Sequence, residues 1–287
     1  MKLTCRVFAA VMLLGILMTG HVFAERAAEN TTAANDWLDA FAERIFNAWR
    51  DGAPMPQLSV AHPEASLEQA YGVQKRFVAR IMASDEIGGF KAAGVASLDE
   101  HSPLTGVMPA SGIGQAADKI VVRLADDPHQ FVENEIGYLF GKAISEPVAS
   151  VEELQRHVQA VLPIIEVPGG ATDASQPATQ QDLVAWNVSG KAMILGPLHA
   201  PSGIDVDAVE IAMTRDEDII NTARGDMAAR GQWNTLLRTV NNVVRQGYVV
   251  EQGHVITNGA LGKILKAEPG RYRADYGPLG VIEFEAR

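Results

Sequence analysis

The sequence is poor in several features that would narrow its class. It has 287 residues and a single cysteine, Cys5, so no internal disulfide framework can form. Its 24 Lys and Arg are outnumbered by 35 Asp and Glu, so phosphate backbones repel it and nucleic acid is not an expected partner. The chain is nevertheless 47% hydrophobic and 21% charged, which is ample for a folded core. Together these features describe an enzyme-sized globular protein.

The signatures of several common chemistries are also missing. There is no glycine-rich phosphate loop, nucleophile-elbow serine, His-Glu zinc helix or cysteine pair. Of the seven histidines, six follow residue 24 and are scattered singly, which is more typical of structural or surface histidines. His101 is the exception that we retain as a candidate catalytic residue, because it lies in a loop that follows a predicted strand.

The first 24 residues have the pattern of a secretory signal peptide. Lys2 and Arg6 form a basic start, and residues 7–20 are an uncharged, mostly apolar run of fourteen. Val22 and Ala24 supply compact residues for cleavage before Glu25. An uncleaved anchor and a misassigned start codon are the alternatives. We therefore expect an exported protein, in a bacterial periplasm, with no membrane contact after cleavage.

The remaining chain predicts an α+β fold with two parts. Residues 25–85 form a helical N-terminal lobe, because apolar residues recur at helical spacing over 35–50 and again over 66–83. Residues 86–287 form a mainly β body that also carries helices. The body is predicted to contain helices over 150–160 and 232–246, and strands over 88–95, 119–124, 130–144, 161–167, 190–198, 206–213 and several short runs in 253–285.

Two glutamates in one predicted strand suggest metal binding. Glu133 and Glu135 point to the same face, because side chains alternate along a strand. Two neighbouring carboxylates in an apolar strand repel each other and are costly to bury as anions. A divalent cation between them removes both problems. The alternative is an ordinary Glu-x-Glu on a solvated strand face.

A third carboxylate and one lysine extend this candidate site. Glu166 ends an apolar strand just before a Pro-Gly-Gly turn, which suits a ligand position. Three carboxylates favour Mg²⁺ or Mn²⁺ over zinc, because no His or Cys is placed to join them. Lys91 lies in a glycine-rich strand and is a candidate for proton transfer or for holding an anionic substrate. A lysine that protects a sheet edge is the equally weighted alternative.

These segments, taken in order, resemble the fumarylacetoacetate hydrolase superfamily, most closely its 2-keto-4-pentenoate hydratase and 4-oxalocrotonate decarboxylase branch. The resemblance runs from about residue 36 to the end of the chain. It is carried by Ala70-Tyr71 with Gln74, Gly89-Phe90-Lys91, Glu133-Asn134-Glu135, Glu166 at 31 residues beyond Glu135, Asn187-Val188-Ser189-Gly190 with Leu195-Gly196, and the segment 255–262.

The resemblance implies a mixed β-roll body, as in the fumarylacetoacetase C-terminal domain, that binds Mg²⁺ or Mn²⁺ through Glu133, Glu135 and Glu166. It implies a hydratase of aromatic catabolism that adds water to a 2-hydroxy-2,4-dienoate, a small 2-keto-acid substrate, through a metal-stabilised enolate. Lys91 would assist the chemistry and Asn187, Ser189 and Thr257 would bind the substrate. The resemblance also implies a homo-oligomer.

One loop of this chain departs from the branch. The loop over 100–108 does not clearly carry the acidic residue that hydratases have there, and Glu100 or His101 is a possible substitute. Decarboxylation of a 2-keto acid and C–C hydrolysis of an acylpyruvate are alternatives on the same metal site. A non-catalytic exported protein that binds 2-keto acids is an alternative from another class.

Overall fold

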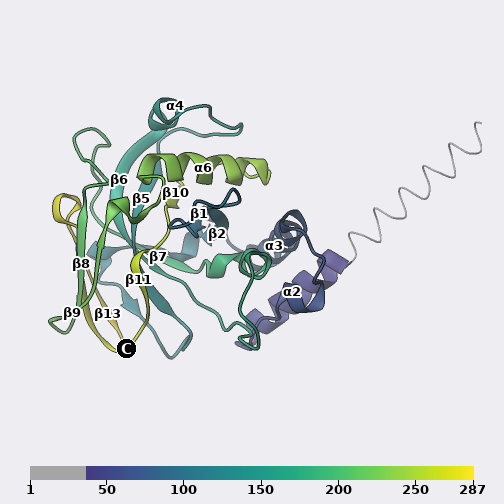
Figure 1. Ribbon diagram of the computed structural model, residues 1–287. Coiled ribbons are helices and arrows are strands. Elements are labelled where there is room, and N and C mark those ends of the chain that lie inside the picture. Colours follow the sequence, from purple (N-terminus) through teal and green to yellow (C-terminus); the bar gives the residue numbers. More distant parts are fainter. Residues whose placement is uncertain (1–36) are drawn as a thin grey trace, which may run out of the picture.

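Two curved sheets and a group of helices form the protein (Figure 1). The computed structural model describes residues 37–287, and the signal peptide predicted over 1–24 lies outside them. Within residues 37–287, no helix is both long and apolar enough to cross a lipid bilayer. The described helices are 37–50, α2 (Leu58–Ala61), α3 (Leu67–Ile81), α4 (Val151–Gln155), α5 (Gln180–Ala185) and α6 (Gln232–Arg245).

The larger sheet has eight strands and mixed pairing. Strand β1 pairs in parallel with β10, and β3 with β7, while the other pairs of this sheet are antiparallel. Its order is β2 (Leu104–Pro109), β1 (Ile87–Ala93), β10 (Val255–Thr257), β5 (Phe131–Phe140), β6 (Val158–Val167), β7 (Ala192–Leu195) and β3 (Ile113–Gln115), with β11 (Leu261–Lys266) also paired to β5.

The smaller sheet has five strands and is antiparallel except where β4 pairs in parallel with β13. Its order is β4 (Val121–Val122), β13 (Val281–Ala286), β12 (Gly270–Asp275), β8 (Glu210–Arg215) and β9 (Asp218–Arg224). Short 3₁₀ turns connect the elements: η1 (Ala110–Gly112), η2 (Ala116–Asp118), η3 (Asn187–Ser189), η4 (Gly225–Met227) and η5 (Gly277–Leu279).

The main core lies between these sheets and under α6. Strand β5 is buried along nearly its whole length, so it is covered on both faces. Helix α6 adds Leu236, Val240 and Val243 to the same apolar cluster, at the i, i+4, i+7 spacing of one helix face. A polar side chain on β5 is therefore enclosed by apolar walls.

The N-terminal helices lie at one side of the β body (Figure 1). Helix α3 begins at the predicted capping box, in which the Ser66 and Gln69 side chains each bond the other's backbone N–H. The apolar cluster of these helices also takes in Val184, Trp186 and Val188 from the β body. The α+β fold with a helical N-terminal portion is confirmed. The domain boundary at residue 85 stays a prediction, and the apolar contacts between the N-terminal helices and the β body cross it.

Candidate metal centre

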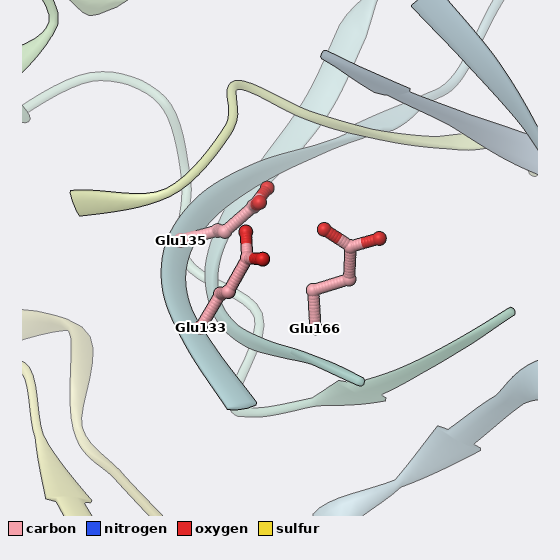
Figure 2. Close-up of side chains that lie close together, drawn as sticks. All are labelled: Glu133, Glu135 and Glu166. Atoms are coloured by element: carbon pink, nitrogen blue, oxygen red, sulfur yellow. The ribbon is translucent and has the colours of Figure 1, made fainter. Parts of the chain in front are cut away.

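The three predicted metal ligands meet in the middle of the larger sheet. Glu133 and Glu135 share one face of β5, and the antiparallel register places Glu166 of β6 directly opposite Glu133. Each residue offers one carboxylate oxygen, and these oxygens all lie within 4.8 Å of one another. Figure 2 shows the three carboxylate ends gathered in one space. Residues 31 positions apart in the chain thus form one acidic cluster.

This cluster is buried and is repulsive on its own. Glu135 and Glu166 have no exposed surface and Glu133 is 7% exposed. Like charges directly opposite on paired strands destabilise a sheet. Lys91 on β1, itself 3% exposed, offsets part of the repulsion, since its Nζ lies 2.5 Å from Glu166 Oε1. Three carboxylates and one ammonium still leave an excess of two negative charges when all are ionised.

The protonation of the cluster reflects this excess. Burial raises the pKa of Glu133 and of Glu135 to about 7, against the opposing effect of Lys91. Burial also raises the pKa of Glu166 well above its usual range. Burial acts to lower the pKa of Lys91, but the three carboxylates outweigh it and the net shift is upward. Lys91 is therefore charged, and the glutamates retain protons near neutral pH that a cation would displace.

The unpaired oxygens of the cluster fit a hard divalent cation. Glu135 Oε1 and Glu166 Oε2 are buried without a hydrogen-bond partner among the described residues. Orphaned buried carboxylate oxygens are costly unless a cation or a proton satisfies them. The candidate ligand atoms are all carboxylate oxygens, which suits Mg²⁺ or Mn²⁺ and not zinc. The residues present therefore fit the predicted metal.

A backbone donor holds Glu135 in place. The N–H of Gly259 donates to Glu135 Oε2 over 2.9 Å. Gly259 has φ of +88°, a left-handed conformation that favours glycine, and a Cβ there would lie 2.9 Å from the Ala92 carbonyl oxygen. Thr257, which precedes Gly259 by two residues and ends β10, is fully buried, and a hydrogen bond from its side chain acts to lower the pKa of Glu135. The Thr257 hydroxyl therefore lies beside the Glu135 carboxylate.

A cavity of about 430 Å³ opens above Lys91 and Glu133. Val188 and Ser189 line it from η3, where Asn187, Val188 and Ser189 all have φ between +51° and +55°. Such left-handed conformations cost L-residues roughly 1–2 kcal/mol each. The strain persists because the Asn187 side chain bonds both backbone groups of Val107, at 2.7 and 2.8 Å. Ser189 thus faces the cavity, whereas Asn187 holds the turn.

The structure does not bring His101 to the carboxylates. It lies in a different cleft, of about 570 Å³, between α3 and α6, and its side chain is 54% exposed. The chain leaves the sheet after β1, and Arg230 and Arg238 hold the 98–102 loop toward α6 by donating to its main-chain carbonyls. The geometry therefore gives no support to the predicted catalytic role of His101.

Several cavity residues were not anticipated from the sequence. Gly259 supplies its backbone N–H, and His129, Phe131 and Leu183 line the cavity mouth. The strand period contained a signal for Phe131, since it precedes Glu133 by two residues and so lies on the same face. Leu183 on α5 had no such signal, because only the folded chain brings it to the cavity. Segment 255–262 was part of the resemblance, but it did not identify the bond from the Gly259 N–H to Glu135.

Comparison with known proteins adds evidence of kinship. No protein-family model matches the chain. A 2-keto-4-pentenoate hydratase of Paraburkholderia xenovorans is 24% identical over 236 residues, 80% of this chain and 87% of that protein. Other relatives at 22–24% identity are also hydratases, and one at 24% is a 4-oxalocrotonate decarboxylase.

The predicted export to a bacterial periplasm is wrong. The relatives with which the chain aligns are cytoplasmic catabolic enzymes of aromatic degradation. The apolar start that suggested export lies outside the described residues, so the structure offers nothing in its favour.

Solved structures agree with the sequence comparison. The 4-oxalocrotonate decarboxylase of Pseudomonas putida G7, crystallised with magnesium and adipate, matches with a TM-score of 0.78 at 19% identity, over 88% of this chain and 98% of that one. A fumarylpyruvate hydrolase of Pseudomonas aeruginosa, with Mn²⁺ and pyruvate, matches at 0.52 and 14% identity, over 69% and 88%. The chain therefore has the fold of the fumarylacetoacetate hydrolase superfamily and is similar in sequence to its 2-keto-4-pentenoate hydratase and 4-oxalocrotonate decarboxylase branch, as its motifs predicted.

Proposed function

We propose that this chain is a divalent-metal-dependent hydratase that adds water to a 2-hydroxy-2,4-dienoate, the enol form of a 2-keto-4-pentenoate-type acid. The observation that carries the proposal is the buried cluster of Glu133, Glu135 and Glu166 with Lys91, of which Lys91 and Glu133 line one cavity. The hydratases among its relatives support the reaction type. The substrate would be a small 2-keto acid, with no nucleic acid or membrane as a partner. We retain the prediction that the protein is a homo-oligomer.

The three glutamates would hold Mg²⁺ or Mn²⁺. When bound, the cation would supply Lewis-acid stabilisation of the negative charge that develops on the 2-oxo oxygen during tautomerisation. Glu166 would serve the metal and Lys91 together, since its Oε1 already lies against Lys91 Nζ. The register of β5 and β6 fixes both carboxylate positions before any ligand arrives, which is the preorganisation that electrostatic catalysis requires.

Lys91 is the proposed proton carrier and substrate anchor. Its ammonium lines the cavity and is the one Lys or Arg on that lining within residues 37–287. A charged Lys91 can bind the substrate carboxylate or donate a proton to the carbon chain as the dienol becomes a ketone. Ser189, on the cavity lining, and Thr257, beside Glu135, are proposed to orient the substrate.

Overall the reaction consumes one water and one dienoate. The enol proton is lost from the 2-hydroxyl, a proton is added at carbon 5, and water then supplies OH at carbon 4 and H at carbon 3. 2-Hydroxypenta-2,4-dienoate thus becomes 4-hydroxy-2-oxopentanoate. The residues above account for the charge on the carboxylate end of the substrate, and Glu135 and Glu166 themselves have no exposed surface.

Decarboxylation of a 2-keto acid is the second candidate. The match to the 4-oxalocrotonate decarboxylase structure, at a TM-score of 0.78, supports it. A decarboxylase on this site would use the same metal and Lys91 but would release CO₂ from a second carboxylate. Acylpyruvate C–C hydrolysis has weaker support, from the 0.52 match to a fumarylpyruvate hydrolase.

The test is to follow the ultraviolet absorbance of 2-hydroxypenta-2,4-dienoate with the purified full chain and Mg²⁺ or Mn²⁺. We expect metal-dependent loss of the dienoate and formation of 4-hydroxy-2-oxopentanoate, identified by mass. 4-Oxalocrotonate is run in parallel, with CO₂ release as the readout.

Glu135→Gln is the matched variant, since it keeps the shape of the side chain and removes its charge. It should lose activity, while Glu153→Gln, on α4 and outside both the cavity lining and the acidic cluster, should keep it. If 4-oxalocrotonate is converted and the dienoate is not, decarboxylation replaces hydration as the proposed function. Turnover of neither substrate, or equal turnover by Glu135→Gln, would refute the metal-dependent lyase.

A further inference from the structure

The cavity above the carboxylates has two chemically different ends. Its base carries Lys91 and Glu133, but its mouth is apolar and partly open to solvent. Three large apolar side chains of the mouth are unusually exposed: Phe131 by 39%, Leu183 by 36% and Ile264 by 59%. They come from β5, α5 and β11, so three separate elements supply the apolar surface. Exposed apolar side chains that converge on a ligand cavity indicate an apolar ligand group.

The mouth also lacks a partner for negative charge. Within residues 37–287, Lys91 is the one Lys or Arg on the lining, and Glu166 already engages it at 2.5 Å. Lys191 lines the neighbouring cavity and is paired with Asp127 over 2.7 Å. His129 is the one histidine on the lining. A carboxylate at the distal end of a substrate would therefore meet Phe131 and Ile264 without an arginine or lysine.

The charges of the site lead to the same expectation. Three glutamates, Lys91 and a divalent cation sum to zero when ionised, and the carboxylate of a 2-keto acid brings the total to −1. A second carboxylate would bring it to −2 in a partly buried site. Burying a charged group without a partner costs much more than burying an alkyl group, which gains free energy against an apolar wall.

We propose that this cavity selects 2-hydroxydienoates and 2-keto acids that carry one carboxylate and an alkyl or aryl distal group, and discriminates against dicarboxylates. The proposal rests on the proposed function, whose substrate class it narrows. Phe131, Leu183 and Ile264 are specificity-determining residues that contact the distal group. The same selection disfavours decarboxylation of the 4-oxalocrotonate type, because that reaction needs a second carboxylate to release as CO₂.

Binding of a matched pair of stable 2-keto acids tests the selection without requiring turnover. 2-Oxohexanoate and 2-oxoadipate share the same six-carbon chain, and only the latter has a distal carboxylate. Calorimetric titration of the Mg²⁺-loaded full chain should give a dissociation constant at least tenfold lower for 2-oxohexanoate. Equal binding, or tighter binding of 2-oxoadipate, would overturn the proposal.

Ile264→Lys adds a cation at the most exposed of the three apolar positions of the mouth, with Ile264→Gln as the neutral control. The lysine variant should improve 2-oxoadipate binding at least fivefold relative to 2-oxohexanoate, and the glutamine variant should leave the 2-oxoadipate constant nearly unchanged. An unchanged ratio in Ile264→Lys, with or without a change of oligomeric state, would contradict a role of the mouth in selection.

Two variants examine the other basic side chains near the mouth. His129 lies on the lining, and Lys266 follows Ile264 by two residues on the same face of β11 without lining the cavity. His129→Gln and Lys266→Gln should leave 2-oxoadipate binding within about twofold of the parent. Selective loss of 2-oxoadipate binding in either variant would reveal a dicarboxylate site and overturn the proposal.

Turnover separates this proposal from the proposed function. The kcat/KM for 2-hydroxyhexa-2,4-dienoate should exceed that for 2-hydroxyhepta-2,4-diene-1,7-dioate at least tenfold. If no dienoate is converted but 2-oxohexanoate still binds preferentially, the hydratase fails and the selectivity stands. If both dienoates are converted equally well, the hydratase stands and the selectivity fails.

Discussion

Two clefts of this protein gather charged side chains, and they differ in whether those charges have partners. In the cleft between α3 and α6, Arg238 donates to the carbonyls of Glu100 and Ser102, and His101 is exposed to solvent. The second cleft, here called the metal cavity, is the one lined by Lys91 and Glu133 together with the adjoining Glu135 and Glu166. There, oxygens of Glu135 and Glu166 are buried without a hydrogen-bond partner among the described residues. Satisfied charges stabilise a loop, whereas unsatisfied buried charges require a ligand.

Replacing Lys91, the one Lys or Arg on the cavity lining within residues 37–287, should have the largest effect. Lys91→Met leaves Glu166 without its partner, and we expect kcat to fall by about 10²–10⁴, the range for a lost general acid or base. The free energy of unfolding in EDTA should fall by about 3–5 kcal/mol, as for other broken buried pairs. Activity and urea denaturation measure the two effects.

Lys191→Met is the control for this comparison. It breaks an ion pair with Asp127 of similar length, but its side chain is 35% exposed and outside the metal cavity. It should lose at most about 1 kcal/mol of stability. Equal losses in Lys91→Met and Lys191→Met would mean that the metal cavity is no different from a peripheral ion pair.

A change of pH should have an intermediate effect on stability and on metal affinity. The pKa of Glu133 and of Glu135 is raised to about 7 without metal, so the folded chain holds more protons than the unfolded chain between about pH 4.5 and 7. Their contribution to stability is therefore present at the acidic end and is lost as pH rises through 7. Metal competes with those protons, so its binding strengthens over the same window.

Thermal denaturation with and without Mg²⁺ at pH 6 and pH 8 measures this linkage. The increase in Tm on adding Mg²⁺ should be larger at pH 8. A Glu133→Gln, Glu135→Gln double variant should show little increase at either pH. A larger Mg²⁺ effect at pH 6 would contradict the assignment of the raised pKa values to the ligands.

Changing the exposed cleft should have the smallest effect. His101→Gln removes a side chain that is 54% exposed and whose Nε2 lies 3.6 Å from Glu100 Oε1. Stability should change by no more than about 0.5 kcal/mol, and kcat/KM by about twofold. A loss beyond tenfold in the dienoate assay would place His101 in the catalytic machinery and erase the distinction between the two clefts.

The shared face of Glu133 and Glu135 was predictable because it depends on local periodicity, which holds for any strand that contains them. The capping box at Ser66 similarly fixed the start of α3. These two features require only the sequence within a few residues of each position. Glu166 was assigned from its place before a Pro-Gly-Gly turn and from the resemblance, and it lies opposite Glu133 only because β6 pairs with β5.

Other features depend on the order in which distant strands pair. Strand β10 inserts between β1 and β5, and this brings Thr257 and Gly259 to Glu135 from more than 120 residues away. Asn187 was predicted to bind substrate, but the fold uses its side chain to hold Val107. Nothing near Asn187 in the sequence identifies that partner.

Local competition explains the errors in secondary structure. Helix α4 ends at Gln155, short of the predicted residue 160, because residues from Val158 onward pair with β5. The strand predicted over 119–124 is reduced to Val121–Val122. Strand β9 and helix α5 were not predicted. For α4 and for the strand at 119–124, tertiary pairing overrides a weak local preference. Helix α5 begins instead at a local capping box formed by Thr179 and Asp182, which the sequence analysis missed.

Calorimetric titration of the metal-free full chain with Mg²⁺ at pH 8 tests the central claim most directly, with Glu135→Gln titrated in parallel. The account predicts one saturable site per chain in the parent and no detectable binding in the variant. Absence of saturable binding of both Mg²⁺ and Mn²⁺ by the parent, or equal binding by Glu135→Gln, would show that the buried carboxylates of Glu133, Glu135 and Glu166 are not a metal centre.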